Sequence, residues 1–249
     1  WSILARDPAT GEMAVAVASR FFAVGAIIPH IRDSRAAVAT QAFVSPLWGV
    51  EGADRIAAGE APATVLADLQ RRDSGAHLRQ WHGMGADGVT AAHTGAGCVD
   101  WAGHVAAPNV SVAGNMLAGP QVIEASRDAF LASEGEPLGE RMLRAMEAGE
   151  EAGGDKRGRQ SACLRIHRGE VYPWLDLRAD DHAAPLVELR RLWAVAHERF
   201  VHFVTGMGTA ENFSGTADRA PITAMIEAAE AERRAAGRRS ASRADPPEP

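Results

Sequence analysis

Apolar positions near the start of the chain follow an extended, β-type pattern. The segments SILAR (2–6) and MAVAVAS (13–19) flank DPATGE, in which Asp7-Pro8 and Gly11 are turn residues, so a β-hairpin is predicted within the first forty residues. The apolar run Ala36–Phe43 predicts a third strand. Because Ala and Val occupy successive positions in these runs, we expect both faces of the sheet to be covered.

Further along the chain, apolar residues alternate between helical and extended spacing. The patterns predict helices at 50–58, 63–72, 118–133, 137–154 and 185–204, and strands within 78–95, 109–117 and 160–178. This order indicates an α+β protein with stacked sheets between helices, which is an αββα order. We expect one domain over residues 1–234 and a flexible tail over 235–249, where Arg, Ala, Ser and Pro replace the apolar pattern.

Charge and composition exclude several classes of protein. The 249 residues carry 26 Lys and Arg against 32 Asp and Glu, a net charge of -6 that opposes nucleic-acid binding. Apolar runs stay well short of the roughly 20 residues that cross a bilayer, so the sequence predicts a soluble, cytoplasmic protein without membrane contact. Two cysteines indicate neither a disulfide framework nor a zinc finger. Phosphate-loop, dinucleotide and zinc-protease motifs do not occur, and we expect no cofactor.

Three polar residues stand in apolar surroundings and are candidates for chemistry. Arg20 directly follows the second predicted strand, and a buried guanidinium requires either a carboxylate partner or an anionic ligand. Gln41 and Asn115 are amides at the ends of strand-like runs. Each is explained either by hydrogen bonding within the core or by stabilisation of an oxyanion.

The segment EAGGDKRGRQSACL contains the densest group of polar residues. Its glycines allow the backbone to approach a ligand closely, and its charges suit a carboxylate. The candidate substrate-binding residues are Asp155, Lys156, which is the only lysine of the chain, Arg157, Arg159 and Gln160. The alternative is a solvated, charged turn at the end of a helix.

A metal site is a weaker alternative. Asp176, Asp180 and His182 follow one another closely, but they lack the separated ligand spacing that zinc and di-metal sites require. The isolated histidines His82, His93 and His104 are given no role.

Five segments in order carry a resemblance to a known family: WSILARDPATGEMAVAVASRFFAVGAIIPHIRD, AVATQAFVSPLWG, VAGNMLAGP, EAGGDKRGRQSACL and YPWLDLRADDH. Together they resemble the DUF1028 family, placed in the N-terminal nucleophile (Ntn) hydrolase superfamily, over nearly all of residues 1–203. The resemblance implies a four-layer αββα sandwich. It also implies a nucleophilic Thr, Ser or Cys at the start of the mature chain, whose free α-amino group acts as the base.

The family pattern Met-Thr-aromatic-Ser aligns its aromatic residue with Trp1 and its serine with Ser2. The resemblance therefore implies a threonine nucleophile immediately before Trp1. Ser2 would line the site on the same face as that threonine, and would be the nucleophile only if the native terminus were altered. A second, partial resemblance, to proteasome-type Ntn subunits, places Ser19 or Arg20 where a polar residue helps to set the base, with Gln41 and Asn115 flanking the reacting carbonyl.

These observations predict a cofactor-independent Ntn-type amidohydrolase. It would cleave a linear or cyclic C–N amide bond in a small polar or anionic substrate. The alternative is a non-catalytic small-molecule binding or assembly protein on the same fold. We also expect a homo-oligomer, because most soluble oligomers are symmetric assemblies of one chain, with Trp193, Phe200 and Phe203 of the helix at 185–204 as the candidate contact face.

Overall fold

A computed structural model of the protein describes residues 1–244. The chain forms two compact units, Trp1–Leu186 and a second that begins at Val187. Of the tail expected over residues 235–249, the last five residues, 245–249, lie outside the described part of the chain. The candidate site lies entirely in the first unit.

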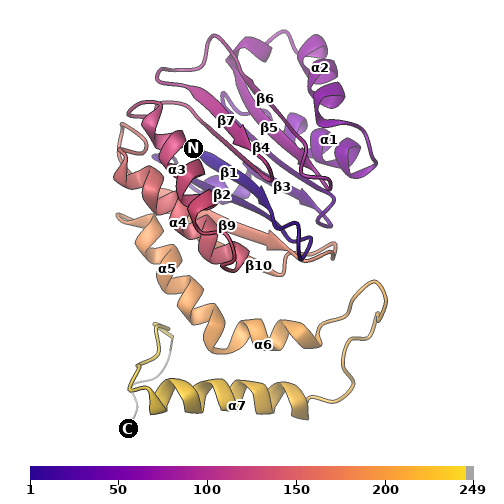
Figure 1. The fold of residues 1–249 in the computed structure, drawn as a ribbon, viewed down its shortest axis with the longest axis vertical. Helices are drawn as coiled ribbons and strands as arrows, with labels where there is room; N and C mark the ends of the chain where they lie inside the picture. The colour runs from indigo at the N-terminus through magenta and orange to yellow at the C-terminus, as the bar shows by residue number, and fades with distance from the viewer. Residues whose placement is uncertain (245–249) are drawn as a thin grey trace. The chain divides into compact units, whose positions relative to one another are not determined.

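Two antiparallel sheets build the first unit (Figure 1). The larger one has the order β10-β9-β2-β1-β8-β7 and the smaller one β3-β4-β5-β6. The strands of the larger sheet are β1 Ser2–Arg6, β2 Met13–Ser19, β7 Gly103–Ala107, β8 Val110–Gly114, β9 Ser161–His167 and β10 Leu175–Ala179. Those of the smaller sheet are β3 Pro29–Arg32, β4 Ala36–Ala42, β5 Arg79–Gly85 and β6 Thr90–Thr94.

The predicted hairpin at the start of the chain is confirmed. Strands β1 and β2 pair antiparallel with Ser2 opposite Val17 and Arg6 opposite Met13. Two strands were missed, β3 and β7, and both are short and lie at the edge of a sheet. Edge strands tolerate a proline such as Pro29 and need only one covered face, so their sequences lack a strong strand pattern.

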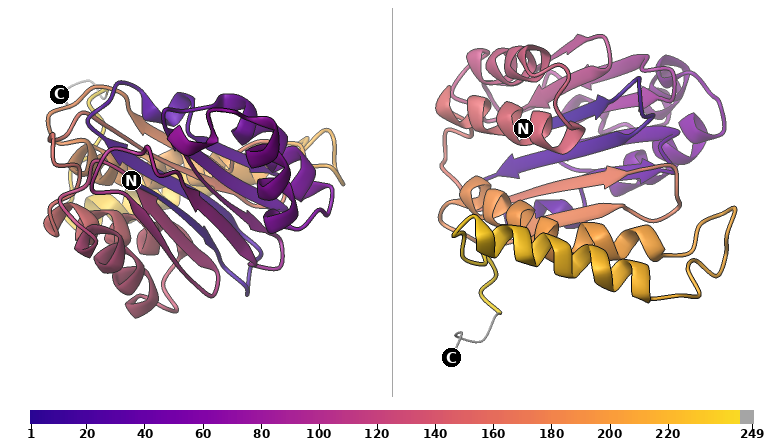
Figure 2. Two further views of the ribbon diagram at one scale, coloured as in Figure 1. Left: turned by 90° about the horizontal axis from the view of Figure 1, so that it is seen from above. Right: turned by 60° about the horizontal axis from the view of Figure 1, so that its bottom comes forward.

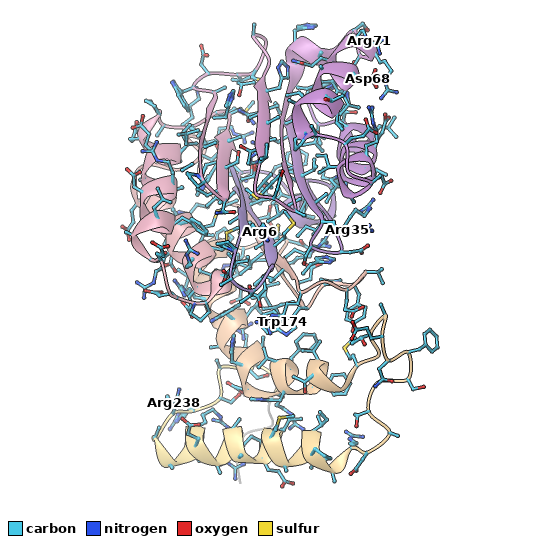
Figure 3. The ribbon with its side chains drawn as sticks, turned by 45° about the vertical axis from the view of Figure 1, so that its right-hand side comes forward. Arg6, Arg35, Asp68, Arg71, Trp174 and Arg238 are labelled. Atoms are coloured by element: carbon cyan, nitrogen blue, oxygen red, sulfur yellow. The ribbon has the colours of Figure 1, made fainter. Side chains whose placement is uncertain are left out.

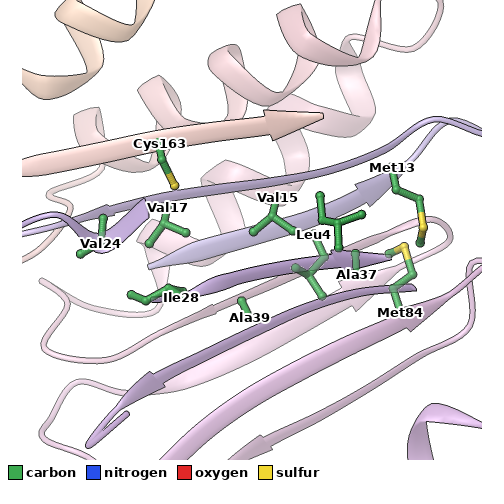
Figure 4. Packing of buried hydrophobic residues seen from close by; sticks show 11 residues of the cluster. Leu4, Met13, Val15, Val17, Val24, Ile28, Ala37, Ala39, Met84 and Cys163 are labelled. Atoms are coloured by element: carbon green, nitrogen blue, oxygen red, sulfur yellow. The ribbon is translucent and has the colours of Figure 1, made fainter. Parts of the chain in front are cut away.

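The space between the two sheets holds one hydrophobic core (Figure 4). Leu4, Met13, Val15 and Val17 enter it from the larger sheet, whereas Ala37, Ala39 and Met84 enter it from the smaller sheet. Because strand side chains alternate between faces, the intervening residues point to the outer faces, where helices cover them. This explains the nearly unbroken apolar runs of β1, β2 and β4.

Helices cover the outer face of each sheet. Helices α1 Pro46–Ala57 and α2 Pro62–Arg72 pack on the smaller sheet, where Trp48 and Trp81 fill a second core. Helices α3 Gln121–Ala132 and α4 Leu138–Glu151 lie against each other and along the larger sheet (Figure 2). On the outer surface of α2, Asp68 pairs with Arg71, and both are labelled in Figure 3.

The helix predicted over 185–204 has an irregular centre. Helix α5 Pro185–Val195 is followed by a π-helical turn, Ala196–Phe200, and by α6 Val201–Phe203. The second unit also contains α7 Ala220–Ala235. Of the candidate contact residues, Phe200 and Phe203 are 42% and 51% exposed, whereas Trp193 is buried with its ring centroid 4.3 Å from that of His197. Within residues 1–244, no helix combines the length and apolar character that a membrane crossing needs.

Candidate functional site

The site lies where β1 begins, between β2 and β8. Trp1 and Ala18 exchange backbone hydrogen bonds of 2.9 and 3.0 Å, which extends the register of β1 and β2 by one residue. On the other side, Ser2 lies opposite Ala113, so Trp1 lies opposite Gly114. By the same register, a residue preceding Trp1 would lie between Ser19 and Asn115. Its side chain would share the face of Ser2, between the sheets.

The environment at this strand end disfavours positive charge. Trp1 is 6% exposed, and burial lowers the pKa of its α-amino group to about 6. Asp155 acts in the opposite direction and raises this pKa, while Arg157 lowers it. The two charged residues of the loop therefore act electrostatically on the start of β1.

Asp155 holds the glycine-rich loop against the end of β2. It is 7% exposed, and its carboxylate accepts hydrogen bonds from the backbone N–H of Arg20 (3.1 Å), the hydroxyl of Ser19 (3.3 Å) and the guanidinium of Arg157 (2.6 and 2.9 Å). Burial raises the pKa of this carboxyl, but the bonds from Arg157 and Arg20 outweigh it and hold the pKa below its usual value. The loop is thus fixed by an ionised, fully paired carboxylate.

The other charged residues of the loop also have partners. The ammonium of Lys156 donates to the carbonyl oxygen of Asp100, and its backbone N–H donates to that of Met116 at 2.9 Å. Arg159 pairs with Glu150 at 3.2 Å. Gln160 accepts a 3.1 Å hydrogen bond from Arg20.

The expectation of a buried Arg20 was wrong. The residue is exposed, because β2 ends at Ser19 and the chain turns into solvent there.

Gln80, a buried residue of β5, connects the two candidate amides. Its side-chain oxygen accepts hydrogen bonds from Gln41 Nε2 at 2.8 Å and from Asn115 Nδ2 at 3.2 Å. Its own Nε2 donates to the carbonyl oxygens of Gly103 (3.0 Å) and Gly114 (2.8 Å). Gln80 therefore joins the smaller sheet to β7 and β8 and brings Gln41 and Asn115 together.

A second polar group lies deeper between the sheets. His82, fully buried on β5, is hydrogen-bonded through Nε2 to Ser2 (2.8 Å) and through Nδ1 to Ser111 (2.9 Å). Burial lowers the pKa of His82 to about 3, so the ring is neutral. Ser2 is itself fully buried and is held by this imidazole.

Two adjoining clefts meet at Trp1 and Ser19. The first, of about 260 Å³, is lined by loop residues that include Asp155, Lys156 and Arg159. The second, of about 190 Å³, is mainly apolar and includes Gln41, Asn115 and Arg157 among its lining residues. Six of the predicted site residues therefore line these two clefts, while Ser2, Arg20 and Gln160 lie beside them.

Sequence reasoning missed Gln80 and assigned no role to His82. Their partners are distant in the chain, so neither residue belongs to a local motif. The available signal was their spacing: Gln80 and His82 are two residues apart on a strand and so share one face. Polar residues on a face that a second sheet covers need specific partners.

Two of the three candidate ligands of the weaker metal alternative are held in ion pairs. Asp176 pairs with Arg165 at 2.8 Å, and Asp180 pairs with Arg178 at 2.9 Å. Among residues 1–244, no group of three or more His, Cys, Asp or Glu side chains is placed to hold a metal ion.

These features define a mixed α/β protein built on antiparallel sheets. The model of a family of unknown function, DUF1028, matches residues 1–189, and the chain belongs to this family. The crystal structure of protein SPO2555 from Silicibacter pomeroyi, also of DUF1028, aligns with a TM-score of 0.81 and 29% identity over 87% of this chain and 98% of that chain.

A second solved structure, Anbu (ancestral beta-subunit) from Yersinia bercovieri, aligns with a TM-score of 0.38 and 10% identity. The alignment covers 77% of this chain and 92% of that chain, and the similarity is too low to inform the fold. No curated protein matches the sequence.

Proposed function

We propose that the protein is a cofactor-independent Ntn-type hydrolase with a four-layer αββα fold, which cleaves a C–N amide bond in a small polar or anionic substrate. The nucleophile is a threonine immediately before Trp1 in the cellular protein. The observation that carries the proposal is the register of β1. By that register, a threonine before Trp1 would lie between Ser19 and Asn115, with its side chain on the same face as Ser2.

In this mechanism the threonine hydroxyl attacks the amide carbonyl, and its proton passes to the neutral α-amino group. Collapse of the tetrahedral intermediate breaks the C–N bond, and the departing amine takes up that proton. Water then hydrolyses the ester to release the carboxylic acid and restore the threonine. The burial of this strand end supports this role, because Trp1 is only 6% exposed and a poorly solvated amine beside it would favour its unprotonated form.

The test uses protein expressed from the full reading frame. Intact-mass analysis should show a free threonine directly before Trp1. An electrophile that acylates N-terminal threonine should add its mass to that residue alone. Alanine in its place should abolish labelling and lower turnover by several orders of magnitude.

A different encoded residue, or labelling elsewhere, contradicts the Ntn mechanism. A non-catalytic binding protein would then account better for the two clefts. Ser2→Ala serves as the matched control, because it removes a nearby hydroxyl that is already bonded to His82. This variant should keep the label.

A further inference from the structure

The hydrogen-bond network around Gln80 fixes which end of each side-chain amide faces which partner. Backbone carbonyl oxygens only accept hydrogen bonds, so the NH₂ group of Gln80 faces the carbonyls of Gly103 and Gly114. Its oxygen therefore faces Gln41 and Asn115. Both of these residues in turn direct an N–H group toward Gln80.

This orientation determines what Gln41 and Asn115 present to the second cleft. One N–H of each amide is bonded to Gln80, which leaves a carbonyl oxygen and a second N–H on each. Gln41 is only 5% exposed, and its oxygen accepts no hydrogen bond from residues 1–244. This oxygen is not fully enclosed by the protein, so it is open to the cleft and available to a hydrogen-bond donor of a ligand. The cleft therefore offers acceptors and donors side by side.

The one charged side chain that lines this cleft, among the described residues, is already paired. Arg157 is its only ionisable lining side chain within the described residues, and the guanidinium is bonded to Asp155. An ammonium ligand would find no free carboxylate here, and a carboxylate ligand would have to compete with Asp155 for Arg157. Transfer of an unpaired charge into such a site is costly. The remaining lining is largely apolar, with Val17, Val24 and Ile28 among its residues.

We infer that the second cleft recognises a neutral carboxamide that carries a small apolar substituent. The amide N–H of the ligand donates to the side-chain carbonyls of Gln41 and Asn115, and the apolar substituent packs on the valine and isoleucine side chains. Gln80 is the positioning residue that sets this polarity. The inference narrows the substrate class of the proposed hydrolase, and it rests on that function only for the reaction that follows binding.

The test compares three small probes with closely similar apolar groups: isovaleramide, isovalerate and isopentylamine. Each is titrated into full-chain protein near neutral pH and followed by NMR, which reports binding and conversion in the same sample. Isovaleramide should bind about tenfold more tightly than either charged probe, since each charged probe would leave buried polar groups unpaired. Equal or tighter binding of isovalerate or isopentylamine overturns the inference.

Variants locate the site. Gln41→Leu keeps a side chain of similar size but removes the buried carbonyl, and should weaken isovaleramide binding about tenfold. The matched control Gln70→Leu lies on α2, where its amide bonds to His93, and should leave binding unchanged. Unfolding curves of both variants accompany the titrations. Unchanged affinity in a folded Gln41→Leu protein contradicts the inference, and the probe comparison on the unmodified chain tests it without any variant.

The experiment distinguishes a failure of the inferred ligand class from a failure of the proposed hydrolase. Preferential binding of isovaleramide without conversion, together with no labelling of an N-terminal threonine, would leave the inferred ligand class intact and remove the hydrolase. Labelled threonine with a preference for isovalerate would do the reverse.

Discussion

Acid should destabilise the protein through His82, because the buried imidazole stays neutral in the folded state. Burial lowers its pKa from 6.5 to about 3. As the pH falls below the pKa of His82 in the unfolded chain, the unfolded chain binds a proton that the folded chain does not. The free energy of unfolding therefore decreases as the pH falls from the unfolded pKa toward the folded one. Between about pH 7 and about pH 4.5 the loss amounts to about 2.5 kcal/mol.

The assay is urea unfolding at both pH values, followed by tryptophan fluorescence, which reports mainly on the first unit because most of the tryptophans lie there. His82→Asn removes the titrating ring while keeping a polar side chain. Its loss of stability on acidification should be smaller than that of the unmodified protein by about 2.5 kcal/mol. Other histidines contribute equally to both proteins, so the difference isolates His82.

Ser111→Ala is the matched control. It removes one hydrogen-bond partner of His82 but keeps the imidazole, so it should lower stability at both pH values and retain the steep dependence on pH. If His82→Asn and the unmodified protein lose the same stability on acidification, His82 is protonated in the folded state and the reasoning from burial is wrong.

Three further predictions concern the loop, the support of Trp1 and the assembly. Arg157→Ala should raise KM in an assay of the proposed amidase. It should also lower the free energy of unfolding by about 1 kcal/mol, because it leaves the buried carboxylate of Asp155 short of donors. The guanidinium of Arg159 is largely exposed, so Arg159→Ala should leave stability unchanged in urea unfolding. Gly149→Ala should lower the melting temperature despite the helix propensity of alanine, because its Cβ would lie 2.3 Å from Ser126 Oγ and 3.0 Å from Trp1 Nε1. Light scattering at micromolar concentration should give a dimer or larger assembly, and a monomer would refute the role of Phe200 and Phe203 as contacts.

The sequence predicted most of the strands and helices of the first unit, because apolar period and turn residues are local signals. It placed the hairpin of β1 and β2 and the two helices of the 46–72 segment to within a few residues. It missed β3 and β7, where short edge strands leave little periodicity. It also marked Gln41, Asn115 and the loop at 155–160 as unusual before any contact was known.

The sequence could not predict which of these residues form hydrogen bonds or ion pairs with each other. Whether Asp155 bonds Arg157 or a ligand depends on where the loop meets β2, a separation of more than 130 residues along the chain. Likewise, Gln80 acquires its importance from carbonyls on β7 and β8, which no local pattern connects to β5. Residue type identified the candidates, and only the register of distant strands showed which of them are already paired.

The space between the two sheets changes character along its length, from Leu4, Met13 and Met84 at one end to His82, Gln80 and Asn115 at the other. The two ends of this interior should therefore tolerate substitutions differently. At the first end, aliphatic residues can replace one another as long as volume is conserved. At the second, polar side chains are hydrogen-bonded to specific groups on other strands, so a single change requires a compensating change on another strand. Divergence within the family should therefore proceed residue by residue at one end and in coordinated sets at the other.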